Sequence, residues 1–198
     1  MKNLLIIVLV LLISVLVFSY NTHAGNRKLE RQKYKVAEHK KGFEIRFYPK
    51  SVMASVSSKR KDSGSNANQN FRILAGYIFG GNQQDKKIAM TTPVYMEKDS
   101  TSNKMSFVLP AQYQIADLPL PKDSSIKIHY SDEGYFACLS FGGFAGEKKI
   151  LRKKRELEQL LNKNGYEIIG NFNYLGYNAP WDIINRENDI IVMINYKN

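Results

Sequence analysis

Metal-binding and nucleophilic side chains are scarce in this sequence. Its 198 residues include one cysteine, Cys138, and three histidines, of which His23 falls in the N-terminal targeting-like segment. A lone cysteine cannot form an internal disulfide, and a chain with no cysteine cluster and no His-x-x-x-His pair gives no support for a structural zinc site. Cys138 lies in the apolar, strand-like run 135–141, so we expect a buried and unreactive thiol.

The usual catalytic motifs are also missing. The chain has no Gly-x-Ser-x-Gly elbow, and Gly142-Gly143 lacks the Lys-Ser/Thr of a phosphate-binding loop. Glu44, Glu97 and Glu187 could act as acids or bases, but exposed strand and loop carboxylates are far more common. The sequence therefore predicts a binding protein and not an enzyme.

Acidic residues are few relative to basic ones. There are 18 Asp and Glu against 29 Lys and Arg, which gives a net charge of +11. Such a basic protein suits nucleic acid, an anionic membrane surface or an acidic small ligand, although a solvated basic surface is the commoner explanation. The densest run of cations is 148–155, and it could rest on anionic lipid.

Long apolar runs are limited to one, from Leu4 to Phe18. A short basic start, an apolar stretch and small residues before a cut after Ala24 are typical of a secretory signal, so we expect export to a periplasm or the exterior. The alternative is an uncleaved membrane anchor through residues 4–20. The run is short for a span, which takes about 20 residues, but the cations that follow it favour retention of the downstream side in the cytoplasm. Export would disfavour nucleic acid as a partner, and we expect none.

After a basic linker, 25–33, we expect one domain over 34–198. Phe43, Ile45 and Phe47 alternate with more polar residues, as in a half-buried strand. The polar stretch 59–68 predicts a loop, and a helix follows that is ended by Gly80-Gly81. The other expected elements are a second helix over 147–162 and extended segments at 52–58, 88–97, 104–109, 126–130, 135–141, 166–177 and 190–196.

These elements occur in the same order twice, at nearly constant offsets. The pattern indicates an internal duplication with halves at about 34–110 and 122–198. We predict an α+β fold: a distorted eight-stranded antiparallel, barrel-like sheet of two pseudo-symmetric strand-strand-helix-strand-strand halves, with two main helices outside.

The first helix has two different faces. Phe71, Leu74, Ala75 and Ile78 make an apolar face that is more often core than ligand site. A second face carries Arg72, Gly76 and Phe79, with Lys86 and Lys87 just beyond. Apolar area beside cations suits a flat apolar ligand that bears carboxylates.

Several motifs resemble those of the SOUL family of haem- and porphyrin-binding proteins. They cover about residues 34–196 in the family's order, and the run Met90-Thr-Thr-Pro-Val94 is the most specific. The full set is Phe43-Glu-Ile-Arg-Phe-Tyr48, Tyr77-Ile-Phe-Gly-Gly-Asn82, Ile88-Ala-Met-Thr-Thr-Pro-Val94, Phe107-Val-Leu-Pro110, Phe141-Gly-Gly-Phe144, Tyr177-Asn-Ala-Pro-Trp181 and Asn185-Arg-Glu-Asn188.

The resemblance implies a two-half distorted barrel and non-covalent binding of haem or another tetrapyrrole without known catalysis. In the family the porphyrin is placed against the first helix and a loop between late strands. By motif, the implied contacts here are Arg72, Leu74, Ile78, Lys87, Pro180, Trp181 and Arg186, with the cations pairing the propionates.

One position departs from the family. Some members have a histidine, proposed as an iron ligand, where this chain has Phe47, and Phe cannot ligate iron. We place His39 in a solvated loop and expect His129 to point away from the core. If haem binds, we therefore expect no strong His ligand, and only Tyr77, Met90 or water as weak ones.

Two other functions remain open. The two-half layout also resembles effector domains related to gyrase-inhibitor proteins, some of which hydrolyse small molecules with a pocket Glu; Glu97 or Glu44 would then be the base. The third hypothesis is a membrane-surface protein whose basic second helix lies on anionic lipid.

Overall fold

The computed structural model describes residues 29–59, 63–99, 101–179, 182 and 185–197, with a few isolated positions between 6 and 14; side chains are described from residue 67 onward in the first helix. These described residues form two long helices and twelve strands. The helices are α2 (Ser63–Ile78) and α3 (Glu147–Lys163), and a single 3-10 turn is η1 (Ile115–Asp117). The strands are β1 (Glu30–Arg31), β2 (Lys35–Lys40), β3 (Phe43–Tyr48), β4 (Val52–Lys59), β5 (Thr91–Thr92), β6 (Val94–Lys98), β7 (Ser102–Val108), β8 (Lys127–Tyr130), β9 (Gly134–Gly142), β10 (Glu167–Ile168), β11 (Asn173–Gly176) and β12 (Glu187–Asn195).

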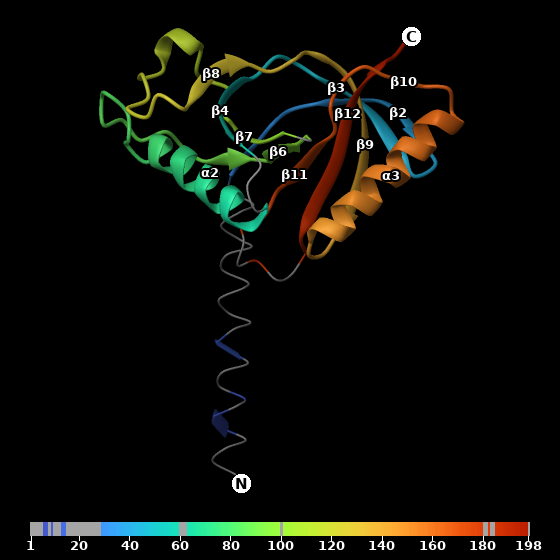
Figure 1. Ribbon diagram of the computed structural model, residues 1–198, viewed down its shortest axis with the longest axis horizontal. Helices are drawn as coiled ribbons and strands as arrows, with labels where there is room; N and C mark the ends of the chain where they lie inside the picture. The colour runs from blue at the N-terminus through green and yellow to red at the C-terminus, as the bar shows by residue number, and fades with distance from the viewer. Residues whose placement is uncertain are drawn as a thin grey trace.

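Ten of these strands form one antiparallel sheet. Its order is β2-β3-β9-β12-β11-β6-β7-β4-β8, with β10 alongside β12, while β1 and β5 make a separate parallel pair. Figure 1 shows the sheet arching over the two helices, with α2 on one side and α3 on the other. The prediction of an α+β fold with a large antiparallel sheet and two main helices is confirmed.

The sheet is not closed into a barrel, and it has ten strands where we expected eight. One additional strand arises because the expected segment 166–177 is divided into β10 and β11. The other is β2, which our prediction missed and which pairs with β3 through a register shift between Val36 and Glu38. It lies at one end of the strand order and β8 lies at the other, so the sheet keeps two edges. The two pseudo-symmetric halves stay a prediction.

Each helix covers its own apolar cluster on one face of the sheet. Leu74 and Ile78 of α2 pack on β4, β6 and β7, whereas Leu157 and Leu161 of α3 pack on β3, β9 and β12. A third cluster lies on the opposite face of the strands and includes Met53, Tyr95, Cys138 and Leu175. Strand alternation explains this division, because neighbouring residues such as Met53 and Ala54 enter different clusters.

Three local predictions needed correction. The helix α2 begins at Ser63, within the stretch 59–68 that we expected to be a loop; its Ser, Gly and Asn residues are weak helix formers, so local preference misled the prediction. His39 lies in strand β2 and not in a loop. The extended segment 88–97 is divided into β5 and β6 by Pro93, which has no N–H for a sheet ladder.

The segment 29–35 lies across the face of the sheet that the helices leave uncovered, and we call it the strap. Strand β1 within it pairs with β5, and the Gln32 N–H donates to the Thr92 carbonyl at 2.8 Å. The described part of the linker predicted over 25–33 thus packs on the domain. Among the described residues, no helix is both long and apolar enough to cross a membrane.

Candidate functional site

A groove of about 570 Å³ lies between α2 and α3, over the β6–β7 hairpin and β11. Its floor is formed by cross-strand neighbours, because Met96 pairs with Met105 on one side and with Tyr174 on the other. Phe172 and the α3 residues Ile150 and Leu151 complete its apolar wall. Four stretches of the chain that are far apart in sequence therefore make one apolar surface.

Lysines stand at the rim of this groove. Lys98, Lys104 and Lys154 all line it, and the Lys154 ammonium lies 4.8 Å from the centre of the Phe172 ring. Lys98 is paired with Glu147. A groove with an apolar floor and cations at its edge can hold a flat apolar molecule and pair its acid groups.

Two polar groups at the groove are already engaged. The Tyr174 hydroxyl donates to Asn188 Oδ1 at 2.7 Å, and its burial raises the pKa of Tyr174. Glu97 Oε1 accepts a hydrogen bond from the Asn171 side chain at 2.8 Å. These contacts fix side chains around the groove and do not form a nucleophile–base pair.

The structure places the site residues implied by the family resemblance at three locations. Leu74 and Ile78 are fully buried in the core under α2. Arg72 and Lys87 are exposed on the outer side of α2, where Lys87 forms a β-bridge with Phe79, a side chain with 64% exposure.

Arg186 lies elsewhere, with its guanidinium 4.8 Å from the centre of the Phe144 ring and Nη1 donating to the Asp182 carbonyl at 2.6 Å. Pro180 and Trp181 lie outside the described residues. None of the five described residues of this set lines the groove, to which α2 contributes Ala67 and Asn70 instead.

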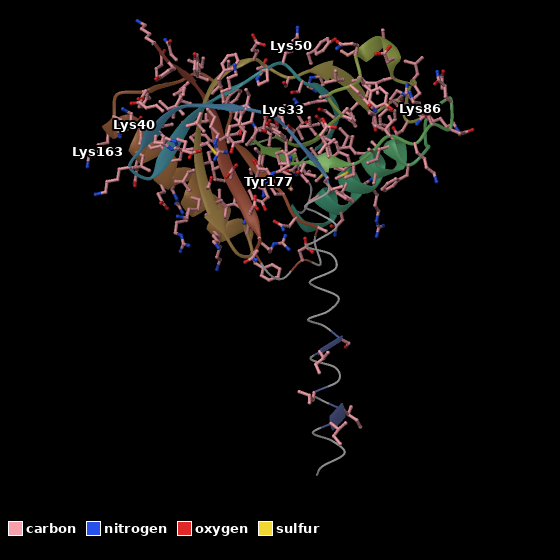
Figure 2. The ribbon with its side chains drawn as sticks, turned by 180° about the vertical axis from the view of Figure 1, so that it is seen from behind. Lys33, Lys40, Lys50, Lys86, Lys163 and Tyr177 are labelled. Carbon is pink, nitrogen blue, oxygen red and sulfur yellow. The ribbon has the colours of Figure 1, made fainter. Side chains whose placement is uncertain are left out.

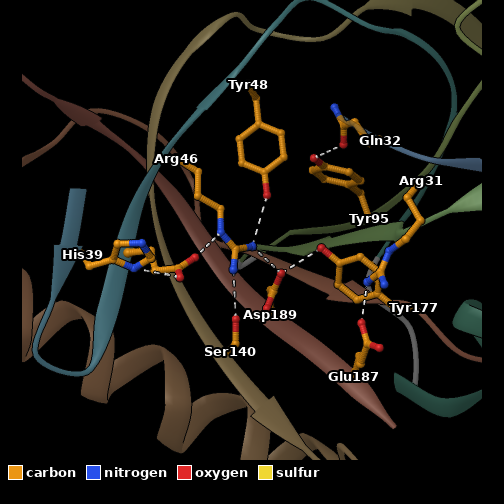
Figure 3. Close-up of polar contacts among 11 residues, drawn as sticks. Arg31, Gln32, His39, Arg46, Tyr48, Tyr95, Ser140, Tyr177, Glu187 and Asp189 are labelled. Carbon is orange, nitrogen blue, oxygen red and sulfur yellow. Dashed lines mark hydrogen bonds and ion pairs between the residues drawn. The ribbon is translucent and has the colours of Figure 1, made fainter. Parts of the chain in front are cut away.

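The face under the strap holds a buried network (Figure 3). Arg46 Nη1 donates to Asp189 Oδ2 at 2.9 Å, and both side chains are only 7% exposed. The Tyr177 hydroxyl donates to the same carboxylate oxygen at 2.7 Å. The strap covers this network, because the Tyr34 ring lies 4.3 Å from the Arg46 guanidinium and the Tyr95 hydroxyl donates to Gln32 Oε1 at 2.5 Å.

Three hollows of about 850, 420 and 320 Å³ border the strap. The largest and the smallest of them are both lined by Arg31, Tyr34, Tyr177 and Glu187. Figure 3 shows Arg31 stacked on the Tyr177 ring and directed at Glu187. The charged groups along this surface are paired with one another, as in Arg31 with Glu187 and Arg46 with Asp189. The groove between the helices combines a continuous apolar floor with lysines at its rim, so it is the better candidate site.

The two described histidines lie away from the groove. His39 is 75% exposed on the edge strand β2, with Nδ1 3.2 Å from Glu44 Oε1. His129 has Nε2 at 2.7 Å from Ser55 Oγ and Nδ1 at 2.8 Å from the Tyr130 carbonyl, so both of its ring nitrogens are engaged.

The weak ligands suggested from the sequence are also occupied by the fold. Tyr77 is buried and donates to the Pro119 carbonyl at 3.0 Å, and Met90 packs against the core under α2. Among the residues that the structure describes, no three His, Cys, Asp or Glu side chains gather to hold a metal ion.

Taken together, the fold and the groove define a two-helix α+β domain with an open antiparallel sheet. The chain belongs to the SOUL heme-binding protein family, whose model matches residues 29–193. It is 31% identical over 156 residues to heme-binding protein 2 of Homo sapiens, covering 75% of this chain and 76% of that protein. Heme-binding protein 1 of Xenopus tropicalis is 30% identical over 157 residues, covering 75% and 81%.

Solved structures share the fold at low identity. The C-terminal domain of EcmrR superposes with a TM-score of 0.61 at 11% identity, covering 83% of this chain and 99% of that domain. A hydrolase from Listeria innocua gives a TM-score of 0.54 at 9% identity, covering 89% and 98%. At these identities the similarities show a shared fold alone.

Proposed function

We propose that the chain binds haem or a related porphyrin non-covalently, as a carrier or buffer and not as an enzyme. The observation that carries the proposal is the apolar groove between α2 and α3 with lysines at its rim. Its family and the names of its relatives support the choice of ligand. A tetrapyrrole has a flat apolar body and carboxylates at one edge, which matches this distribution of side chains.

In this proposal the ring lies against Met96, Met105 and Phe172, and its carboxylates reach Lys104 and Lys154. Burial of the ring would supply most of the affinity, because apolar area removed from water dominates such sites. The family resemblance suggests a different placement, on the outer side of α2 with Arg72 and Lys87, and toward Arg186 with Pro180 and Trp181. Charge reversal distinguishes the two placements.

The experiment is a titration of the purified protein with hemin and protoporphyrin IX, followed by the Soret band and by quenching of aromatic fluorescence. We expect Lys104→Glu with Lys154→Glu to weaken binding by about tenfold or more, since each lost pair costs on the order of 1 kcal/mol. The matched control is Arg72→Glu with Lys87→Glu, which changes the net charge of the protein by the same amount and should leave the affinity for the porphyrin unchanged.

If the protein with Arg72→Glu and Lys87→Glu lost affinity and the protein with Lys104→Glu and Lys154→Glu did not, the ligand would be bound on the outer side of α2. The absence of saturable binding at micromolar ligand in the wild-type protein would refute the function itself.

Iron ligation by histidine has no support from the site. We propose that hemin and protoporphyrin IX bind about equally, because His39 and His129 do not line the groove and Met96, Met105 or water is the nearest source of a weak ligand. A low-spin bis-nitrogen spectrum, or loss of hemin binding alone in His39→Ala or His129→Ala, would contradict this.

Catalysis by a pocket glutamate is the rival function. Glu97 does line the groove, but its carboxylate accepts from Asn171, and Glu44 is bound by Arg46 Nε at 2.7 Å. We propose that neither acts as a base. Glu97→Gln should therefore leave hemin affinity unchanged, and the wild-type protein should not hydrolyse ester or lactone test substrates.

We also propose that residues 1–24 direct export, with retention as an anchor as the alternative; the mass of the mature protein in its host decides between them.

The internal duplication is proposed as well. Its support is a symmetry of the strand order β3-β9-β12-β11-β6-β7-β4-β8. The counterparts in the two halves are β3 and β8, β4 and β9, β6 and β11, and β7 and β12. When each strand is replaced by its counterpart, the order becomes the same list read backwards.

A further inference from the structure

The outer face of α3 combines cations with exposed apolar side chains. Lys148, Arg152 and Arg155 are exposed and lie four and then three residues apart, so they form one stripe along the helix. Leu151, which also forms part of the groove wall, stands at the border of this stripe and is 46% exposed. The opposite side of α3, with Leu157 and Leu161, is buried in the core, and no part of the chain that the structure describes covers the stripe.

The loop before α3 continues this surface. In this loop the Phe144 ring is 59% exposed. The guanidinium of Arg186 lies 4.8 Å from its ring centre. An exposed aromatic ring bordered by cations is the arrangement of segments that lie at the surface of a membrane.

This surface is at the end of the domain where the chain enters. Gly142 pairs with Glu187 across β9 and β12, and Glu187 pairs with Arg31 of the strap. Figure 1 shows α3 beginning at the lower edge of the domain. In the uncut chain the apolar run Leu4–Phe18 is only ten residues, 19–28, away from Leu29, so it would hold this end close to a bilayer.

We propose that Phe144, Lys148, Leu151, Arg152 and Arg155 form a surface that binds the anionic phospholipids of a membrane. The cations pair with lipid phosphates, and the Phe144 and Leu151 side chains enter the apolar boundary below them. Nucleic acid would also attract the cations, but its phosphate backbone offers no apolar layer for these two side chains. The proposal does not depend on tetrapyrrole binding.

The test uses the full chain with a fluorescent label at this surface. Cys138 is buried, so Phe144→Cys provides the reactive thiol for an environment-sensitive nitrobenzoxadiazole label, and the wild-type protein controls for labelling at Cys138. The labelled protein is reconstituted with vesicles of phosphatidylcholine, either alone or with about one third phosphatidylglycerol. We expect emission to shift to the blue and to rise on the order of twofold in the anionic vesicles only, and to revert at high salt.

Charge reversal supplies the matched control. The triple change Lys148→Glu, Arg152→Glu and Arg155→Glu should abolish the response, whereas Lys41→Glu, Lys87→Glu and Lys127→Glu, at other exposed sites, should preserve it. Equal emission in both vesicles, equal loss in both triple variants, or a response to duplex DNA that exceeds the response to anionic vesicles would each overturn the proposal.

Discussion

Arg46 and Asp189 are 143 residues apart in sequence and share a buried ion pair at 2.9 Å. Arg46 Nη2 also donates to Ser140 Oγ at 3.1 Å, and Nε donates to Glu44. Every charged group in this cluster is thus matched by a hydrogen-bond partner. Removal of one member would leave a charge buried without its counter-ion.

The first prediction concerns that pair. Asp189→Ala should lower the free energy of unfolding by about 3–5 kcal/mol, because the Arg46 guanidinium stays buried after its carboxylate is lost. The matched control is Lys122→Ala, which breaks the exposed Lys122–Asp85 pair and should cost less than about 1 kcal/mol. Urea unfolding measures both values.

A cost below about 1 kcal/mol for Asp189→Ala would show that water reaches Arg46 and that the pair is not buried in solution. If the alanine variant does not fold, Asp189→Asn, which keeps the side-chain shape, should still unfold at a lower urea concentration than the wild type.

At the residue scale, local pattern was informative about burial and uninformative about pairing. The period-2 run from Phe43 to Phe47 correctly marked a strand, and Leu74 and Ile78 correctly marked the inner face of α2. Arg46 sits in that same run at a position expected to be polar and exposed, yet it is buried. Its partner comes from β12, and no local signal announces a contact over that separation.

At the element scale, two glycines at the end of α2 have opposite requirements. Gly76 lies on the exposed face of the helix with no atom near the position of an added Cβ. At Gly81 an added Cβ would stand 2.7 Å from the Gly76 carbonyl oxygen, the acceptor of the Gly81 N–H. Packing therefore requires a glycine at position 81 but not at position 76.

We therefore predict opposite effects for the two alanine substitutions. Gly76→Ala should raise the free energy of unfolding by up to about 1 kcal/mol, which is the helix-propensity difference. Gly81→Ala should lower it, because the helix end must move to accommodate the methyl group. Thermal unfolding of the pair is the measurement, and equal shifts of Tm would contradict the structure of this turn.

The strap gives a second prediction at this scale. A chain that starts at residue 25 should be as stable as the full chain. One that starts at residue 35 should lose about 2–4 kcal/mol, because the Gln32–Tyr95 hydrogen bond and the Tyr34–Arg46 and Arg31–Tyr177 stacking contacts disappear. Urea midpoints compare the chains, and an unchanged midpoint for the shorter chain would show that the strap is not docked.

Elements with weak local signals were the ones that sequence reasoning missed. In β2, only Val36 and Ala37 are apolar among six residues, since an exposed edge strand needs no buried face. The groove was missed for a related reason: Met96, Lys104, Lys154 and Phe172 come from separate elements and meet only after folding. Figure 2 shows how widely lysines are spread over the surface, so charge alone does not single out the rim.

For the whole molecule, the repeated pattern of segments and the family-like motifs predicted the class of fold correctly. They did not predict correctly whether the sheet closes into a barrel. Two helices and an antiparallel sheet were implied by segments of the right period and length. Whether the sheet closes depends on the edges, and the edge strand β2 lies in the stretch whose pattern was weakest.

Buried tyrosines give the whole domain a dependence on alkaline pH. Burial raises the pKa of Tyr177 well above its usual value near 10, and the neighbouring Asp189 carboxylate raises it further. Burial likewise raises the pKa values of Tyr48 and Tyr95. Since these hydroxyls keep their protons in the folded state, their contribution is complete below the unfolded pKa near 10 and is lost as the pH rises above it.

The last prediction is the size and the origin of that loss. Above about pH 10, each buried tyrosine should lower the free energy of unfolding by up to about 1.4 kcal/mol per pH unit, because the unfolded chain releases a proton that the folded chain retains. Urea unfolding at about pH 9 and pH 11 measures the difference. Tyr177→Phe should make the pH dependence shallower, because it removes a buried hydroxyl whose pKa is raised. Equal slopes in wild type and Tyr177→Phe would mean that the Tyr177 hydroxyl titrates freely and that the network around Asp189 is open to water.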